Sequence, residues 1–212
     1  MPQELANLYS RWDALLRPLG TPATRHHDFE QLVRHYREPH RGYHTLAHIA
    51  DCLRQFDGVR HMAPRDADTI ETAIWFHDVI YDPRRSDNEG ASAEYATVAL
   101  ARLGADEPFR EQVSRLIGLT RHTQLPTDLA GQLMVDVDLS SLGASAAVFE
   151  QNGQNIRREF AHVDDATYRR SRADILRKFD ARPRIYLTDV FFARHEQAAR
   201  ANLRRAIKAM EG

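Results

Sequence analysis

His77 and Asp78 are the residues of this sequence whose types and setting point most directly to chemistry. They follow one another within Ala73–Tyr81, where the flanking residues are almost all apolar. This pattern predicts a helix that is buried nearly all round, where an unpaired carboxylate would cost roughly several kcal/mol. A bound metal cation would compensate that charge. The structural alternative is that Asp78 caps a helix or pairs with an arginine, while His77 is a hydrogen-bonded histidine of the core.

Two histidines precede this pair. His44 and His48 are four residues apart, so on a helix their imidazoles lie on the same face. That spacing suits two nitrogen ligands that converge on one ion, although no glutamate follows the first histidine as it does in zinc-binding helices. The chain has 11 histidines, so a pair at this spacing can also arise by chance. In that case one histidine lies at a helix start and the other is an unrelated surface residue.

Two aspartates form a third group. Asp136 and Asp138 alternate with apolar residues in Met134–Leu139, a pattern typical of a strand. The segment is short and stands among helical patterns, so we predict that it begins a helix, for which one aspartate is alternatively the N-cap. A histidine on a helix, a buried His-Asp step and a later buried aspartate together predict a metal site with mixed nitrogen and oxygen ligands.

Helical periodicity dominates the segments that must position these residues. Apolar residues recur three and four apart, and proline or glycine interrupts them at Gly20–Pro22, Pro39–Gly42 and Asp82–Pro83. We therefore predict an all-α fold in a single domain, residues 1–212. Helices are expected over Leu5–Leu19, Phe29–Tyr36, Leu46–Phe56, Ile70–His77 and Asn88–Leu103, from Asp106 onward, and around Phe149–Phe160, Ile175–Phe179 and Thr188–Met210.

The composition is that of a globular protein, with 42% hydrophobic and 28% charged residues among 212. Cys52 is the only cysteine, which excludes an intrachain disulfide. Met1–Leu16 carries acids and no apolar segment of signal-peptide type, and no apolar run approaches the roughly 18 residues that span a bilayer. We therefore expect a cytoplasmic protein with no membrane association.

Charge is unevenly distributed, although the formal net charge is −1. Arg157–Lys208 holds 14 Lys and Arg against 7 Asp and Glu, so the rest of the chain is net acidic. One interpretation is that this basic segment forms a solvated helical face. The other is that some of its arginines bind an anionic substrate. The near-neutral total offers no broad surface for a long polyanion, so a nucleic-acid partner is not expected.

The order His, then His-Asp, then Asp resembles the HD superfamily of metal-dependent phosphohydrolases. The local strings are similar to one branch, the small stand-alone proteins described as predicted metal-dependent HD phosphohydrolases. The resemblance covers most of the chain and rests on Tyr43-His44-x3-His48-Ile49, Trp75-Phe76-His77-Asp78-x2-Tyr81-Asp82, Asp87-Asn88-Glu89-x2-Ser92-Ala93, Thr120-x-His122, Asp136-x-Asp138-Leu139-Ser140-x-Leu142-Gly143, Ile156-Arg157-Arg158-Glu159-Phe160 and Ala199-Arg200-x-Asn202-Leu203.

The resemblance implies an HD-type helical bundle with a core of about residues 28–143 and additional C-terminal helices over about 144–212. It also implies a bound divalent metal. Two histidines and two aspartates suit manganese, iron, cobalt, magnesium or zinc, and the ligand types do not choose among them. The ligands that the resemblance implies are His48, His77, Asp78 and Asp138.

Two of these ligands have alternatives nearby. His48 is preferred over His44 because the apolar helix follows it directly. Asp138 is preferred over Asp136 because members of the superfamily place a leucine soon after this ligand. In this chain Leu139 is the next residue and not the second one after the ligand, so the departure leaves Asp136 open.

The activity that the resemblance implies is hydrolysis of a phosphate ester or anhydride in a small phosphorylated metabolite or nucleotide, by metal-activated water. Asp78 is expected to bind the metal and to orient that water, with Arg41 and His122 beside it in catalysis. The planar N–H groups of arginine suit phosphate. The substrate phosphate is expected to contact one or more of Arg157, Arg158 and Arg172.

Two other functions fit parts of the pattern. An HD-type di-iron oxygenase needs extra histidine ligands, which His44 and His122 are able to supply. A non-catalytic, metal-containing module would use the basic C-terminal surface to bind RNA or a protein partner. The complete ligand set favours an enzyme, because a site that has lost its activity should lose ligands first. The oligomeric state is left open.

Overall fold

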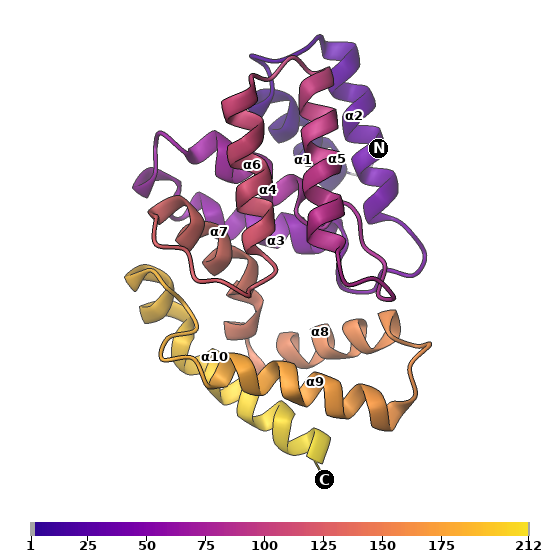
Figure 1. Cartoon of the computed structure of the whole chain (residues 1–212), viewed down its shortest axis with the longest axis vertical. Helices are drawn as coiled ribbons and strands as arrows, with labels where there is room; N and C mark the ends of the chain where they lie inside the picture. Colours follow the sequence, from indigo (N-terminus) through magenta and orange to yellow (C-terminus); the bar gives the residue numbers. More distant parts are fainter. Residues whose placement is uncertain (1–2, 212) are drawn as a thin grey trace.

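Ten α-helices and two short 3-10 helices form the fold (Figure 1), and the described residues, 3–211, include no β-strand. The structure is a computed structural model, and it confirms the all-α prediction. No helix in the described part of the chain is both long and apolar enough to cross a bilayer. The elements are α1 (Gln3–Leu15), α2 (Pro22–Tyr36), α3 (Leu46–Asp57), η1 (Arg60–Met62), α4 (Ala67–Phe76), α5 (Asn88–Arg102), α6 (Glu107–Leu119), α7 (Leu129–Leu139), η2 (Ser140–Gly143), α8 (Ala146–Glu159), α9 (Asp165–Asp180) and α10 (Asp189–Glu211).

The helices form two parts that lie one above the other in Figure 1. α1–α7 make the larger part, and α8–α10 form a layer beneath it. α9 packs along α10, and α10 packs against η2, the short helix that follows α7. One cluster of buried apolar side chains runs through both parts, from Trp12 to Leu203. The C-terminal helices therefore share the core of the larger part.

Local signals fix several helix boundaries. Thr21 caps α2 by accepting a backbone N–H of the first turn, and Pro22 occupies the first helical position. Asp106 caps α6 by accepting the N–H of Phe109. Gly104 follows α5 with a φ of 83°, a left-handed conformation that glycine adopts without a Cβ clash. The boundaries at Gly104 and Asp106 agree with the predictions from sequence, whereas α1 ends at Leu15, before the predicted Leu19, and α2 begins at Pro22, before the predicted Phe29.

The helix expected to continue through His77 ends at Phe76. His77 is its C-cap, and Asp78 lies in the turn that follows. In that turn, the side chain of Arg41 donates to the carbonyl oxygens of Asp78 and Val79. The His-Asp step therefore lies at a helix end: α4 is buried nearly all round as predicted, but the prediction that the helix continues through His77 and Asp78 is wrong.

Two further expectations about local structure are corrected. Met134–Leu139 forms the end and not the start of α7, because Asp128 already caps that helix through the N–H of Gly131. His44 lies before Thr45, the N-cap of α3, so it does not share a helical face with the second histidine of its motif. In both cases an N-cap residue, Asp128 for α7 and Thr45 for α3, sets the start of the helix. Periodicity alone had not located these starts.

Buried polar groups join the C-terminal layer to α7. The carboxylate of Asp136 accepts the backbone N–H groups of Leu187 and Thr188 at 2.7 and 2.8 Å. The hydroxyl of Tyr186 donates to the carbonyl of Leu139 at 2.9 Å. Because unsatisfied buried polar groups are costly, these bonds hold the layer in register against the end of α7 that carries the later aspartate of the motif.

Candidate metal centre

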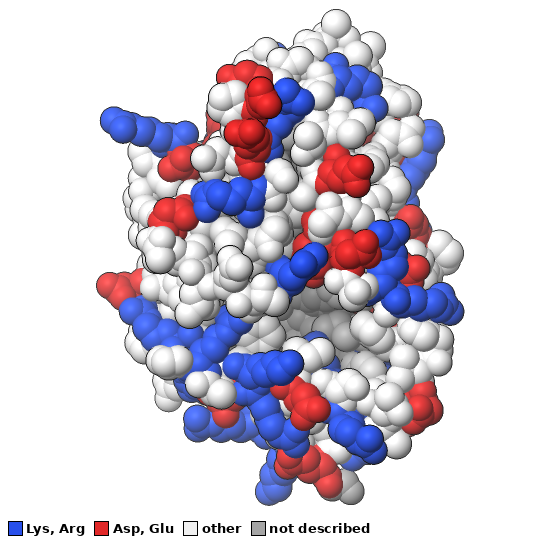
Figure 2. Space-filling model, viewed as in Figure 1, with Lys and Arg blue, Asp and Glu red and all other residues white. Residues whose placement is uncertain are grey.

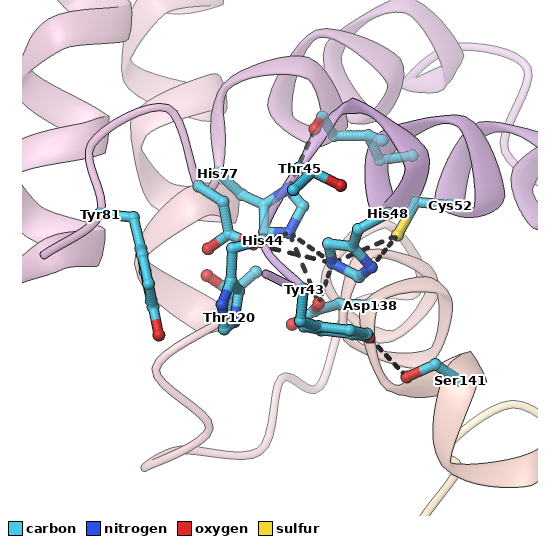
Figure 3. A network of polar contacts seen from close by, with 12 residues as sticks. Tyr43, His44, Thr45, His48, Cys52, His77, Tyr81, Thr120, Asp138 and Ser141 are labelled. Carbon is cyan, nitrogen blue, oxygen red and sulfur yellow. Dashed lines mark hydrogen bonds and ion pairs between the residues drawn. The ribbon is translucent and has the colours of Figure 1, made fainter. Parts of the chain in front are cut away.

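The four preferred ligands meet at one point although they come from three separate segments. His48 lies on α3, His77 and Asp78 follow α4, and Asp138 lies near the end of α7. Figure 3 shows the side chains of His48, His77 and Asp138 pointing toward one another. Nε2 of His48 is 3.3 Å from Nε2 of His77 and 3.4 Å from Oδ1 of Asp138. Oδ2 of Asp78 is 3.1 Å from Nε2 of His77.

These donor atoms are spaced as the ligands of one ion are. The two histidines lie 3.3 Å from each other and 3.1–3.7 Å from the carboxylates of Asp78 and Asp138. Nitrogen and oxygen ligands about 2.0–2.2 Å from a tetrahedral ion stand roughly 3.3–3.6 Å from one another. Two lone pairs on facing imidazole nitrogens repel unless a proton or a cation lies between them. His48, His77 and Asp78 therefore fit a divalent metal, and Asp138, which lies within 3.5 Å of both histidines, is the fourth residue that would hold it.

His77 is oriented by its second ring nitrogen. Nδ1 lies 2.9 Å from the carbonyl oxygen of Ile74, and that contact is a hydrogen bond only if Nδ1 carries the proton. In the neutral ring, Nε2 then presents its lone pair to the cluster. A carbonyl that fixes the tautomer in this way is the usual partner of a metal-binding histidine.

Arg41 supports the site from outside the cluster. Its guanidinium donates to the carbonyl oxygens of Asp78 and Val79 at 2.6 and 2.8 Å, and it pairs with Glu38 at 2.9 Å. The side chain is buried, and it also donates to the carbonyl oxygen of His44 at 3.0 Å. The structure therefore gives Arg41 a positioning role at the turn that carries Asp78, in place of the expected catalytic one.

His122 reaches the cluster through Asp138. Its Nε2 is 2.9 Å from Oδ2 of Asp138, while Oδ1 faces the two ligand histidines. The backbone of His122 has a φ of 57°, an uncommon left-handed conformation, and Arg182 donates to its carbonyl at 2.7 Å. Nδ1 of His122 is buried without a partner among residues 3–211. The predicted catalytic histidine is thus at the site, where it orients the carboxylate of Asp138.

Charges within the cluster favour its ionised forms. Burial alone would raise the pKa of Asp78, but the nearby histidines, His77 first, hold that pKa well below its usual range. Burial likewise opposes ionisation of Asp138, and hydrogen bonds from the surrounding imidazoles hold its pKa well below the ordinary value. Burial would lower the pKa of His77, but the two carboxylates raise it overall. Both carboxylates are therefore anionic at neutral pH and suited to bind a cation.

Cys52 lies beside the cluster and is not among the predicted ligands. Its Sγ is 3.7 Å from Nε2 of His48, and His48, Cys52 and Asp138 offer donor atoms within 4.8 Å of one another. Burial raises the pKa of the thiol well above its ordinary value, and the charge of Asp138 adds to this effect. Cys52 is thus a further donor beside the cluster, on the same helix as His48. The sequence did hold a signal for this donor, because His48 and Cys52 are four residues apart and so lie on one face of the same helix.

His44, the alternative to His48, is bound elsewhere. Its Nδ1 is 2.7 Å from Oε2 of Glu159, and its ring stacks on Tyr81 with 4.0 Å between ring centroids. Glu159, at the end of α8, also accepts the backbone N–H groups of Gly42, Tyr43 and His44 at 2.7–2.9 Å. Sequence analysis missed the role of Glu159 because its partners lie 115 to 117 residues away along the chain.

Asp136, the alternative to Asp138, is turned to the C-terminal layer. Besides the two backbone N–H groups of Leu187 and Thr188, it accepts the hydroxyl of Thr188 at 2.6 Å. Burial raises the pKa of Asp136 above its usual value. The carboxylate is therefore occupied by the junction between α7 and the segment before α10.

Asp136→Asn is expected to lower the free energy of unfolding by about 2 kcal/mol and to leave metal affinity nearly unchanged. One amide NH2 would face backbone N–H donors and leave buried groups unpaired. Urea unfolding and a metal titration measure the two effects. Asp174→Asn, at an exposed acid of α9, is the control and should change neither quantity. Loss of metal binding in Asp136→Asn would contradict the assignment of Asp138 as the ligand.

A cavity of about 360 Å³ lies beside the cluster. Asp78, His122 and Asp138 form part of its wall, and Arg172 and hydrophobic side chains of α8 and α9 contribute another part. Figure 2 shows a hollow between the larger part of the molecule and the C-terminal layer. The volume is in the range of pockets that hold small molecules.

Arg172 is the one of the three arginines expected at the substrate phosphate that lines this cavity. Arg157 instead donates to the carbonyl oxygens of Phe160 and Val163 at 2.7 and 3.1 Å, and Arg158 lines a separate cleft. Figure 2 shows Lys and Arg side chains gathered over the outer surface of the C-terminal layer. Most of the basic final third is thus a solvated face, and the structure does not bring Arg157 and Arg158 to the cavity.

Comparisons of this chain with protein-family models, curated proteins and solved structures found no match. What the site can do follows from its own residues. His48, His77 and Asp78 offer donor atoms close enough to hold a divalent cation, with Asp138 beside both histidines, and the adjoining cavity provides room for a small molecule. Arg172 provides a positive charge for an anionic group in that cavity.

Proposed function

We propose that this protein is a metal-dependent phosphohydrolase of the HD type that acts on a small phosphorylated compound. The observation that carries the proposal is a cluster of two histidines and two aspartates whose carboxylates, Asp78 and Asp138, line a cavity together with Arg172. The resemblance of the surrounding motifs to HD phosphohydrolases supports the same activity. A divalent metal beside a single arginine is an arrangement that suits a phosphate group.

Each residue has a defined part in this mechanism. When bound, a divalent metal lowers the pKa of a water molecule and polarises a phosphoryl oxygen. Asp78, whose carboxylate lines the cavity, accepts a hydrogen bond from the attacking water and orients it. His122 holds Asp138 in place through Nε2, and Arg172 neutralises charge on the phosphate. Phosphoryl transfer to water depends mainly on this positioning and charge neutralisation.

Arg172→Gln is expected to raise KM for a phosphorylated substrate by about ten- to a hundredfold, with a smaller change in kcat. The reason is that a charge-assisted hydrogen bond to phosphate contributes roughly 1.5–3 kcal/mol and is formed before the reaction begins. Arg170→Gln is the matched control, because Arg170 is exposed on the same helix and does not line this cavity. Equal KM values for Arg172→Gln and Arg170→Gln would contradict the role of Arg172.

A screen of nucleotides and sugar phosphates, with manganese, iron, cobalt, magnesium and zinc supplied in turn, tests the proposed activity. We expect hydrolysis with at least one metal and only a mild dependence on salt. Activity confined to long RNA, with affinity falling steeply as salt rises, would contradict a small substrate. Metal binding without hydrolysis of any compound would favour the non-catalytic binding module, and oxygen uptake by the iron-loaded protein would favour the oxygenase.

A further inference from the structure

The cavity beside the metal cluster has two unlike walls. The larger part of the molecule contributes polar groups, among them Asp78, His122 and Asp138. The C-terminal layer contributes mainly hydrophobic side chains from α8, the residue that follows it, and α9. Those on which the argument rests are Ile156, Phe160, Ile175 and Phe179. A ligand that fills the cavity therefore meets a charged surface at one end and an apolar one at the other.

The apolar wall is incompletely covered by the chain itself. Ile175 is 43% exposed, and Ile156, Phe160 and Phe179 are half-buried although they surround one cavity. Apolar surface that is gathered in a concave site and left open to solvent is typical of a ligand-binding pocket. A hydrophobic group of the ligand would remove this surface from water.

Hydrogen-bonding groups are scarce on this side of the cavity. Of the side chains that α8 and α9 contribute, Asn152 and Arg172 are polar, and the others are hydrophobic or glycine. A sugar ring placed there would bury several hydroxyl groups against carbon atoms, and each hydroxyl without a partner weakens binding. The wall therefore disfavours a polyhydroxylated group.

The supply of positive charge limits the number of phosphates. Arg172 is the one Lys or Arg among the described residues that line the cavity, and Glu89 adds a negative charge to the wall. One phosphate next to the metal cluster can be neutralised by the metal and Arg172. The charges of a second and a third phosphate would face carboxylates and hydrocarbon without a fixed cation.

We propose that the substrate is a phosphate monoester whose alcohol portion is hydrophobic, a hydrocarbon ring or an aromatic group, and that the α8–α9 wall selects it. The inference rests on the proposed phosphohydrolase function and adds the substrate class to it. The phosphate lies against the metal cluster and Arg172, and the hydrophobic alcohol portion lies against Ile156, Ile175 and Phe179. Hydrolysis breaks the phosphorus–oxygen bond to the alcohol, with water supplying the incoming oxygen and the proton that the leaving alcohol takes.

Cyclohexylmethyl phosphate and glucose 6-phosphate form a matched pair for the test. Both carry a six-membered ring and a primary alcohol as leaving group, so they differ mainly in the polarity of the ring. For the metal-loaded protein, we expect kcat/KM to be at least about thirtyfold higher for cyclohexylmethyl phosphate. Equal values, or a preference for the sugar phosphate, would overturn the substrate class and leave the phosphohydrolase function standing.

Calorimetry with cyclohexylmethylphosphonate, which water does not hydrolyse, separates this inference from the activity. Binding to the metal-loaded protein is expected, and its loss in Arg172→Gln is expected as well. If neither phosphate ester is hydrolysed but the phosphonate binds, the proposed function fails and the specificity of the cavity stands. No binding of the phosphonate would overturn the inference whatever the activity.

Ile175→Ser probes the apolar wall itself. Ile175 is 43% exposed, so a polar residue there should not disturb folding. We expect kcat/KM for cyclohexylmethyl phosphate to fall about tenfold, with little change for glucose 6-phosphate. Val148→Ser is the control, because Val148 is 48% exposed on α8 and lies outside the cavity. Equal losses for both substrates, or no loss for either, would overturn the assignment of this wall to the alcohol portion.

Discussion

Replacing His77 with alanine is expected to lower the affinity for a divalent metal by more than about a hundredfold and to reduce hydrolysis to background. Loss of a residue that only supports a ligand already costs about ten- to a hundredfold. His77 is buried, its tautomer is fixed by the carbonyl of Ile74, and its Nε2 is within 3.5 Å of donor atoms of the other three ligands. Metal titration of the demetallated variant, followed by an activity assay after reloading, measures both effects.

His44→Ala is the matched comparison for this variant. His44 is the other histidine of its motif, but its Nδ1 binds Glu159 and its ring stacks on Tyr81. We expect this variant to retain metal affinity within about tenfold, and to lose some activity because His44 lines the cavity. Retention of metal by His48→Ala together with its loss from His44→Ala would show that the ligand of this motif has been misassigned.

Glu159→Gln is expected to lower the free energy of unfolding by about 3 kcal/mol at neutral pH. Glu159 is buried and accepts three backbone N–H groups, the hydroxyl of Tyr81 and Nδ1 of His44. Burial alone would raise its pKa, but these bonds, that from His44 first, lower the pKa to about 2 from an ordinary value of 4.5. Urea unfolding of both proteins without metal gives the difference.

The pH dependence of that difference follows from the lowered pKa. A carboxylate with a depressed pKa contributes its full stabilisation above the unfolded value of 4.5 and loses it as pH falls toward the folded value of about 2. The gap between wild type and Glu159→Gln should be constant near neutral pH and should shrink below pH 4.5. Glu150→Gln, at an exposed acid of the same helix, should change stability by less than about 0.5 kcal/mol. A similar loss in both variants would contradict the role of Glu159.

Much of the fold could be predicted from sequence because most helices carry their own boundary signals. Asp106 and Gly104 lie at predicted helix ends that the structure confirms, and the predicted break at Gly20–Pro22 falls between α1 and α2. The end of α4 was mispredicted because the apolar run continues past Phe76, while the turn that follows is held by Arg41, which is 37 residues before Asp78 in the chain and binds its carbonyl. Such a contact between distant parts of the chain leaves no trace in local periodicity.

The candidate site also contains residues that could be predicted from sequence and residues that could not. His48, His77, Asp78 and Asp138 could be found from sequence because each belongs to a short string of distinctive residues. The choice of Arg172 among three arginines could not, because it depends on which face of α9 is turned to the larger part of the molecule. The role of Glu159 also needs the folded chain, since α8 must return to the loop at Gly42–His44 before its carboxylate finds partners.

The central claim is that His48, His77, Asp78 and Asp138 form one metal site, and metal stoichiometry tests it most directly. Wild-type protein and His77→Ala are stripped of metal, reloaded with manganese, iron, cobalt, magnesium or zinc, freed of excess ion and measured by elemental analysis. We expect about one divalent ion per wild-type chain with at least one of these metals, and none in His77→Ala at the same concentration. Wild-type protein that holds no ion under any loading, or a variant that holds as much as wild type, would contradict the claim.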